Sequence, residues 1–162
     1  MTEKAGAAID PKSLEPRVGS GYPAPFAEDC AKREKRRLGD VFGLTQFGVN
    51  LVRLPPGQMS SQRHWHHRED EFVFVLRGTV ALVTDAGEHE LGPGMVAGFK
   101  AGVSDGHHLV NRTAEDAVYL EVGTRDPKEE ADYPDIDLLL RIVDGEQRWV
   151  HRDGTLYKEE DK

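Results

Sequence analysis

The chain has 162 residues, an apolar fraction of 38% and 17 glycines, a composition typical of one turn-rich domain that buries a core of its own. It has no run of ~18 apolar residues, which predicts no membrane span and no membrane partner. Its N-terminus lacks the apolar core of a signal peptide, and its single cysteine, Cys30, allows no intrachain disulfide. We therefore expect a cytoplasmic protein. A formal net charge of −8 repels phosphate backbones, so we expect no nucleic acid among its partners.

The first 40 residues are typical of an arm followed by a short helix. Residues 1–25 are polar and rich in proline, which favours an extended segment that is ordered only where it lies on another part of the protein. Residues 26–38 favour a short helix that ends at Gly39 and Asp40. Its second half holds five basic residues: Lys32, Arg33, Lys35, Arg36 and Arg37. We interpret them as a solvated helix face, with an anion-binding patch as the alternative.

The rest of the chain changes to period two, which indicates strands. Residues 46–54 alternate and are stopped by two prolines and a glycine. Residues 71–76 are apolar on both faces, which predicts a strand buried on both sides. Further strands are expected at 79–84, 87–91, 95–99, 107–111 and 117–123, with a C-terminal hairpin at 138–143 and 147–151. Many short strands separated by turn signals predict an all-β sandwich or jelly roll rather than an α/β fold.

Histidines and a glutamate gather around the strand predicted at 71–76. His64 and His66 are two residues apart, which on a strand places both imidazoles on one face, where they can share a metal at ~2.0–2.1 Å. Glu71 has the opposite parity, so it reaches the same cavity only if the polar residues before it form a turn or bulge. His107 comes from a later strand, and Asn111 shares its parity and is placed to support the site through hydrogen bonds. Three imidazoles and one carboxylate suit Mn, Fe, Ni, Co or Zn, whereas Ca and Mg prefer oxygen ligands.

The spacing of these residues resembles the two sequence motifs of the cupins. The first motif runs from Gly57 through His64-Trp65-His66 and Glu71 to Gly78, and the second from Gly94 through Lys100-Ala101-Gly102 to His107 and Asn111. The resemblance implies a single domain, residues 1–162, built on a double-stranded β-helix barrel (41–125). An N-terminal arm with a short helix (1–40) would precede the barrel, and a C-terminal extension (126–162) would follow it. It also implies that His64, His66, Glu71 and His107 hold one divalent transition metal.

The chain departs from the cupin pattern at positions that bear on the substrate rather than on the metal. Lys100 stands where a proline is usual, Met95 stands where an acidic residue is common, and the loop before His107 is two residues longer. Possible pocket residues besides the ligands are Arg77, Asn111 and Tyr119. Arg77 shares the parity of Glu71, so it either faces the barrel as an anion ligand or reaches solvent, and the inward or outward phase of Tyr119 and Glu121 is open.

The resemblance points to bacterial single-domain cupins of largely unassigned activity, some of them labelled sugar-phosphate isomerases by analogy. We therefore expect a metal-dependent enzyme that acts on a small oxygenated metabolite such as a sugar or sugar phosphate. Isomerisation is favoured, with dioxygenase or lyase chemistry as alternatives. A non-catalytic binding or sensing module is a second class of function, and a structural role through oligomerisation is a third. The apolar hairpin at the C-terminus covers the sheet or forms a subunit interface, and we expect a homodimer.

Overall fold

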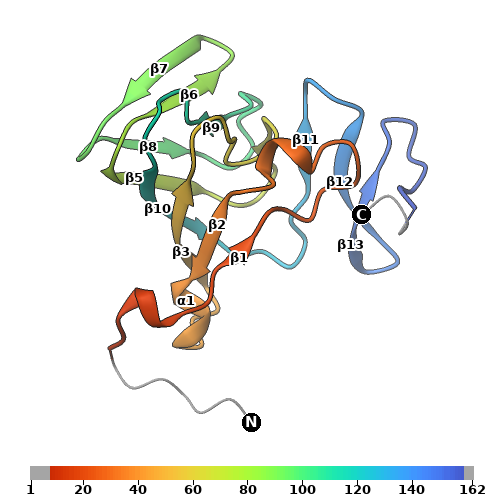
Figure 1. Cartoon of the computed structure of the whole chain (residues 1–162). Helices are drawn as coiled ribbons and strands as arrows, with labels where there is room; N and C mark the ends of the chain where they lie inside the picture. The colour runs from red at the N-terminus through yellow and green to blue at the C-terminus, as the bar shows by residue number, and fades with distance from the viewer. Residues whose placement is uncertain (1–7, 159–162) are drawn as a thin grey trace.

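A computed structural model describes residues 8–158, which form an all-β protein of three sheets (Figure 1). The six-stranded sheet has the order β1 (Arg17–Val18), β2 (Glu34–Arg37), β3 (Phe47–Leu54), β10 (Ala117–Thr124), β5 (Glu71–Arg77) and β8 (Val96–Phe99). The four-stranded sheet has the order β13 (Glu146–Val150), β12 (Leu138–Val143), β11 (Ala131–Tyr133) and β4 (Trp65–His66). The third sheet has the order β7 (Gly87–Leu91), β6 (Val80–Thr84) and β9 (His108–Val110). Helical turns are short: η1 (Pro11–Ser13), η2 (Glu28–Cys30) and α1 (Leu38–Val41).

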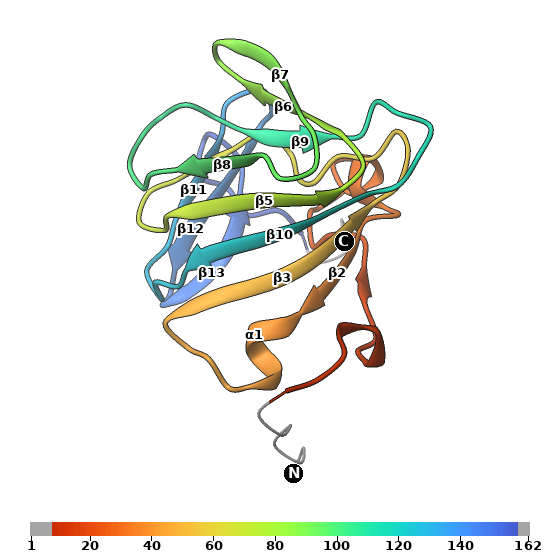
Figure 2. The ribbon, with the colours of Figure 1, turned by 90° about the vertical axis from the view of Figure 1, so that its left-hand side faces the viewer.

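The six-stranded sheet is antiparallel between neighbouring strands, and Figure 2 shows β8, β5, β10, β3 and β2 side by side. Its inward side chains meet those of the three-stranded sheet in one core, in which Leu54 and Val75 have no exposed surface. The prediction of an all-β jelly roll is confirmed. Within residues 8–158 the sheets are not closed into one hydrogen-bonded barrel.

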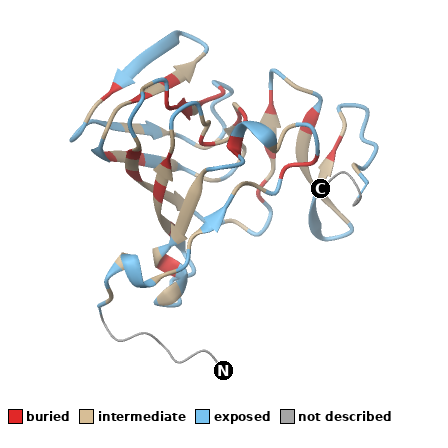
Figure 3. Cartoon of the chain, viewed as in Figure 1, coloured by how far each residue is buried: buried red, intermediate tan, exposed pale blue. Residues whose placement is uncertain are grey.

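A second cluster joins the N-terminal arm to the C-terminal strands. Tyr22 and Cys30 from the arm are buried against Tyr133 and Leu138 of the four-stranded sheet, and Figure 3 shows buried segments in this region as well as in the main sheet. The predicted C-terminal hairpin is confirmed as β12 and β13. The first seven residues of the predicted arm and the last four of the predicted extension lie outside the described range.

The helix predicted at residues 26–38 is wrong. Glu28–Cys30 form a single helical turn and Leu38 begins α1, whereas Glu34–Arg37 form β2, which pairs antiparallel with β3 from Glu34↔Arg53 to Arg37↔Asn50. Backbone hydrogen bonds to the edge of the sheet outweigh the helix propensity of this charged segment. Lys35, Arg36 and Arg37 therefore alternate between the two faces of a strand, Lys32 and Arg33 precede it, and the solvated helix face that we expected does not exist.

The prediction that the strand at 71–76 is buried on both faces is also wrong. Val73 and Val75 face the core, whereas Phe72 is 43% exposed and Leu76 is 44% exposed on the opposite face. A continuous apolar run is found in strands that are packed on both faces and also in strands whose outer face is not packed against any other part of the same chain, so the run alone does not distinguish them. The homodimer predicted from the sequence stays a prediction. Among the described residues, no helix is long and apolar enough to cross a membrane.

Candidate metal centre

The four side chains expected at a metal centre come from two loops and two strands, which backbone pairing holds together. His64 and His107 form an isolated antiparallel bridge, in which each backbone N–H donates to the other residue's carbonyl at 3.2 and 2.8 Å. His66 lies on β4 and pairs with Ala131 of β11. The chain bends after β4, so that Glu71 opens β5 with its side chain directed to the same centre. On one straight strand His66 and Glu71 would point to opposite faces, but the bend allows both side chains to face the same centre.

The donor atoms of these side chains converge. His64 Nε2 lies 3.0 Å from His66 Nε2, and Glu71 Oε2 lies 3.2 Å from both His66 Nε2 and His107 Nε2. His64 Nε2 and Glu71 Oε2 are 4.0 Å apart. Around an ion with bonds of ~2.1 Å, donors at right angles lie about 3.0 Å apart and donors on opposite sides about 4.2 Å apart. The separations among His64, His66 and Glu71 therefore fit one shared ion, since their donor atoms all lie within 4.8 Å of one another. His107 Nε2 approaches this group through Glu71, and the donor types suit a divalent transition metal.

A hydrogen bond at the far side of the His64 ring selects the tautomer that a metal needs, whereas His107 Nδ1 is buried and has no hydrogen-bond partner within residues 8–158. His64 Nδ1 lies 2.8 Å from the Gln62 carbonyl oxygen, so it carries the proton and leaves Nε2 with a free lone pair. His107 is 4% exposed, and its ring stacks on Phe99 with centroids 3.5 Å apart. Both imidazoles are thus held in place by contacts that do not use the converging nitrogens.

The carboxylates make this centre favourable for positive charge. Burial and the neighbouring His66 lower the pKa of His64 to about 3, so that its ring is neutral. Burial lowers the pKa of His66 too, but hydrogen bonds to Glu129 and Glu71 outweigh burial and raise that pKa to about 10. Burial raises the pKa of Glu71, yet hydrogen bonds from His107 and His66 outweigh it and hold this pKa well below its ordinary range. His64 is thus neutral, the state in which an imidazole binds a metal, whereas His66 has to lose its ring proton when a metal binds.

Sequence reasoning missed Glu129, which supports the centre from the loop before β11. Its side chain is 2% exposed. One oxygen accepts a hydrogen bond from the backbone N–H of His67 at 2.9 Å and lies 3.3 Å from His66 Nδ1, and the other accepts from the Arg68 N–H at 2.8 Å. Glu129 therefore orients the His66 ring and also fixes the bend that brings Glu71 into place. No local pattern could have identified it, since residues 126–135 are distinguished only by charge and proline.

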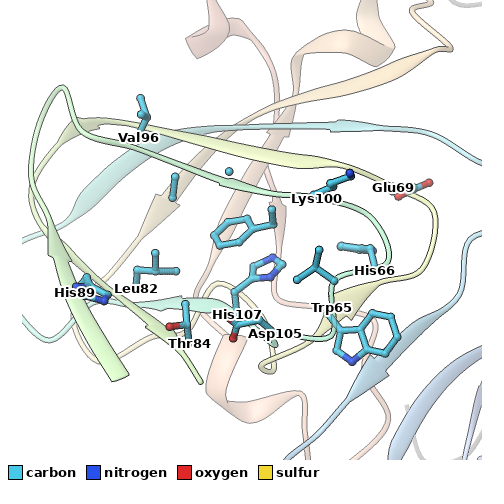
Figure 4. Close-up of a pocket in the computed structure, with 14 residues that line it drawn as sticks. Trp65, His66, Glu69, Leu82, Thr84, His89, Val96, Lys100, Asp105 and His107 are labelled. Atoms are coloured by element: carbon cyan, nitrogen blue, oxygen red, sulfur yellow. The ribbon is translucent and has the colours of Figure 1, made fainter. Parts of the chain in front are cut away.

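Three cavities meet at the four converging side chains. An inner cavity of about 190 Å³ is lined by all four of them. A wider cavity of about 540 Å³ contacts His66 and His107, which Figure 4 shows with Trp65, Glu69 and Lys100 among its lining residues. A polar cavity of about 420 Å³ contacts His66 and Glu71 from the side of β2 and β3.

One further carboxylate lies where the inner and the polar cavities adjoin. Glu121 on β10 lines both, and its Oε1 accepts hydrogen bonds from Lys35 Nζ at 2.6 Å and from Asn50 Nδ2 at 3.0 Å. The sequence left open whether Tyr119 and Glu121 face inward or outward. Both face inward, and Tyr119 is 1% exposed and lines the inner cavity.

The other two possible pocket residues lie elsewhere. Asn111 is fully buried, but its amide donates to the Leu54 and Glu115 carbonyls and its oxygen accepts from Thr113, so it stabilises the 111–115 turn rather than the centre. Arg77 is exposed at the far end of β5, opposite Val118. Of the two alternatives given for Arg77, the structure shows the one in which it reaches solvent at the end of the strand, whereas the hydrogen bonds of the Asn111 amide are used within its own turn.

Comparisons with known proteins agree with this geometry. A family model described as a cupin domain matches residues 50–123. The crystal structure of a sugar phosphate isomerase from a cupin superfamily, from Silicibacter pomeroyi, is 45% identical and aligns over 95% of this chain and 98% of its own with a TM-score of 0.88. A protein from Acidithiobacillus ferrooxidans, provisionally named a sugar phosphate isomerase, is 31% identical over 80% of this chain and 82% of its own, with a TM-score of 0.71. A polyketide cyclase from Streptomyces resistomycificus, 20% identical over 75% of this chain and 81% of its own at a TM-score of 0.62, shares the fold. No curated protein matches the chain.

Proposed function

The chain belongs to the cupin family, and on that basis we propose that it is a metal-dependent isomerase of a small sugar or sugar phosphate. The observation that carries the proposal is the convergence of three imidazoles and one carboxylate on a cavity whose wall holds a further carboxylate, Glu121. The names of the two proteins over 30% identical support the substrate class.

In this proposal His64, His66, Glu71 and His107 hold the metal, and Glu121 moves the proton. When bound, a divalent transition metal supplies Lewis acidity, which polarises a carbonyl and acidifies the adjacent C–H. Glu121 is held by Lys35 and Asn50 through Oε1 alone, so Oε2 remains to accept a proton. Glu121 takes the proton from the carbon beside the carbonyl and returns it to the former carbonyl carbon, while the hydroxyl proton moves between the two oxygens.

The test begins with elemental analysis of protein purified without chelator or histidine tag, beside His64→Ala and Glu71→Ala. We expect near-stoichiometric transition metal in the wild type and its loss in both variants. The metal-loaded protein is then incubated in D2O with aldoses, ketoses and their phosphates, and proton NMR follows the loss of the exchangeable C–H signal. Glu121→Gln should keep the metal and lose the exchange, whereas Glu115→Gln, the same change at an exposed position, should keep both.

Two outcomes would refute the isomerase. One is equal turnover by the metal-loaded and the chelated protein, because the metal would then do nothing in the reaction. The other is full metal occupancy with no exchange on any sugar. In that case oxygen consumption would favour a dioxygenase, and a ligand-dependent rise in melting temperature without turnover would favour a binding module.

A further inference from the structure

Arg33 is a cation that lines the inner cavity and has no acidic partner among residues 8–158. It immediately precedes β2 and lines this cavity. Its Nη2 donates to the Gly19 carbonyl at 2.7 Å and its Nη1 donates to the Ser60 carbonyl, while its Nε is buried and makes no hydrogen bond within residues 8–158. Lys35, in contrast, is 2.6 Å from Glu121. Because Arg33 is partly buried and its Nε is fully buried, an anion in the cavity would be favourable here.

A second polar group in the same cavity is also left without a partner. The side chain of Tyr119 is buried, and within the described part of the chain its hydroxyl makes no hydrogen bond of normal geometry, although the Ser60 hydroxyl is near. A buried hydroxyl is almost always hydrogen-bonded in a folded protein. Tyr119 arises from β10 and Arg33 precedes β2, so two independent elements each present an unused donor to one space.

The inner cavity connects these donors with the candidate metal centre. Its volume of about 190 Å³ corresponds to roughly six water molecules, which suits a short oxygenated molecule. Guanidinium groups recognise carboxylate and phosphate through several N–H donors in one plane, and Arg33 has donors to spare at Nε and at both Nη atoms. The same cavity thus offers donors for an oxyanion and is lined by the three histidines and Glu71.

We propose that Arg33 and the Tyr119 hydroxyl form an oxyanion subsite that binds the charged group of the substrate. The substrate would then be a small anionic molecule, either a sugar phosphate or a sugar acid, whose carbonyl end lies at the histidines. The assignment of that carbonyl end rests on the proposed function, whereas anion binding at Arg33 does not. The net charge of −8 disfavours an anionic ligand, but the nearby positive charge of Arg33 attracts one to this cavity.

Calorimetric titration of the full chain tests the subsite, in metal-loaded and in chelated form, with inorganic phosphate, acetate and uncharged glycerol as probes. We expect one phosphate or acetate per chain in both forms, and no glycerol. Arg33→Gln should weaken anion binding about ten- to a hundredfold, the effect of losing a charge-assisted hydrogen bond. Arg112→Gln removes the same charge from an exposed pair with Glu88 and should leave the affinity unchanged. A preference for phosphate would indicate a phosphorylated sugar, and a preference for acetate a sugar acid.

Tyr119→Phe separates binding from folding, since Arg33 also ties the arm to the Ser60 loop. This variant removes only an unpaired hydroxyl, so its melting temperature should equal or exceed that of the wild type, while anion affinity falls several-fold. The proposal is overturned if anions bind only to the metal-loaded form and with equal affinity to Arg33→Gln, or if no probe binds. It is also overturned if the isomerase exists but Arg33→Gln leaves KM for the phosphorylated sugar unchanged. Anion binding that depends on Arg33 in a protein without isomerase activity would instead overturn only the proposed function.

Discussion

Glu129 offers the sharpest test of how the candidate metal centre is supported. Its buried carboxylate holds three N–H groups: the backbone N–H of His67 and Arg68 and the ring Nδ1 of His66. Glu129→Gln preserves shape and one acceptor oxygen but removes the charge that polarises the His66 ring. A carboxylate that orients a metal-binding histidine is typically worth ten- to a hundredfold in metal affinity, or about 1.4–2.7 kcal/mol.

The two substitutions at this position separate affinity from stability. In Glu129→Gln one N–H faces an amide NH2 group, so the free energy of unfolding should fall by about 1–3 kcal/mol. Glu129→Ala leaves two partly buried backbone N–H groups without their carboxylate acceptor, and a loss of about 2–6 kcal/mol is expected. The bend before β5 should then loosen, which would displace Glu71 from the histidines.

Metal affinity is measured by competition against a chromogenic chelator, and stability by urea unfolding of the metal-free protein. Glu130→Gln serves as the control, because Glu130 accepts from the Ile142 N–H rather than from His66. Its affinity should match that of the wild type. If Glu129→Gln binds metal as tightly as Glu130→Gln, Glu129 does not act on His66 through its charge, and our account of the support is mistaken.

Two further predictions concern the scaffold. At Gly78 (φ +72°) an added Cβ would lie 2.5 Å from the Asp116 carbonyl oxygen, so Gly78→Ala should lower the free energy of unfolding by at least about 3 kcal/mol. Gly57→Ala (φ +76°, no neighbour within 4 Å) should cost about 1 kcal/mol in the same urea experiment, and equal losses would contradict the steric argument. The hydrogen bond from Arg53 lowers the pKa of Glu34 below its ordinary value of 4.5, so this stabilisation is present above pH 4.5 and is lost as the pH falls through the lower folded-state pKa. Glu34→Gln should therefore show a shallower decline of stability below pH 4.5 than the wild type, and parallel curves would rule out the linkage.

The local pattern of the sequence was sufficient for β3, for β5 to β10, for the C-terminal hairpin and for the shared face of His64 and His66, but not for β1, β2 or β11. Period-two alternation at 46–54 and the turn signals after it depend on neighbouring residues, and these determine β3, β6 and β7. His64 and His66 share a face because of their spacing. The motif spacing also related Glu71 and His107 to them through the cupin resemblance, which the comparisons confirm at the level of the family.

Local pattern failed wherever a partner distant in the chain decided the outcome. Residues 34–37 carry helix-forming side chains, yet the unpaired edge of β3 made them a strand. Asn111 has the parity of a site residue, but its own turn uses its whole amide.

The sequence by itself thus determined which residue types gather at the centre, because ligand spacing and strand alternation are local properties. Only the tertiary structure decided what surrounds them. Glu129 reaches His66 across 63 residues and Lys35 reaches Glu121 across 86, and Arg33 faces the inner cavity only because β2 joins the sheet. These contacts depend on sheet order and register, which no short stretch of sequence encodes.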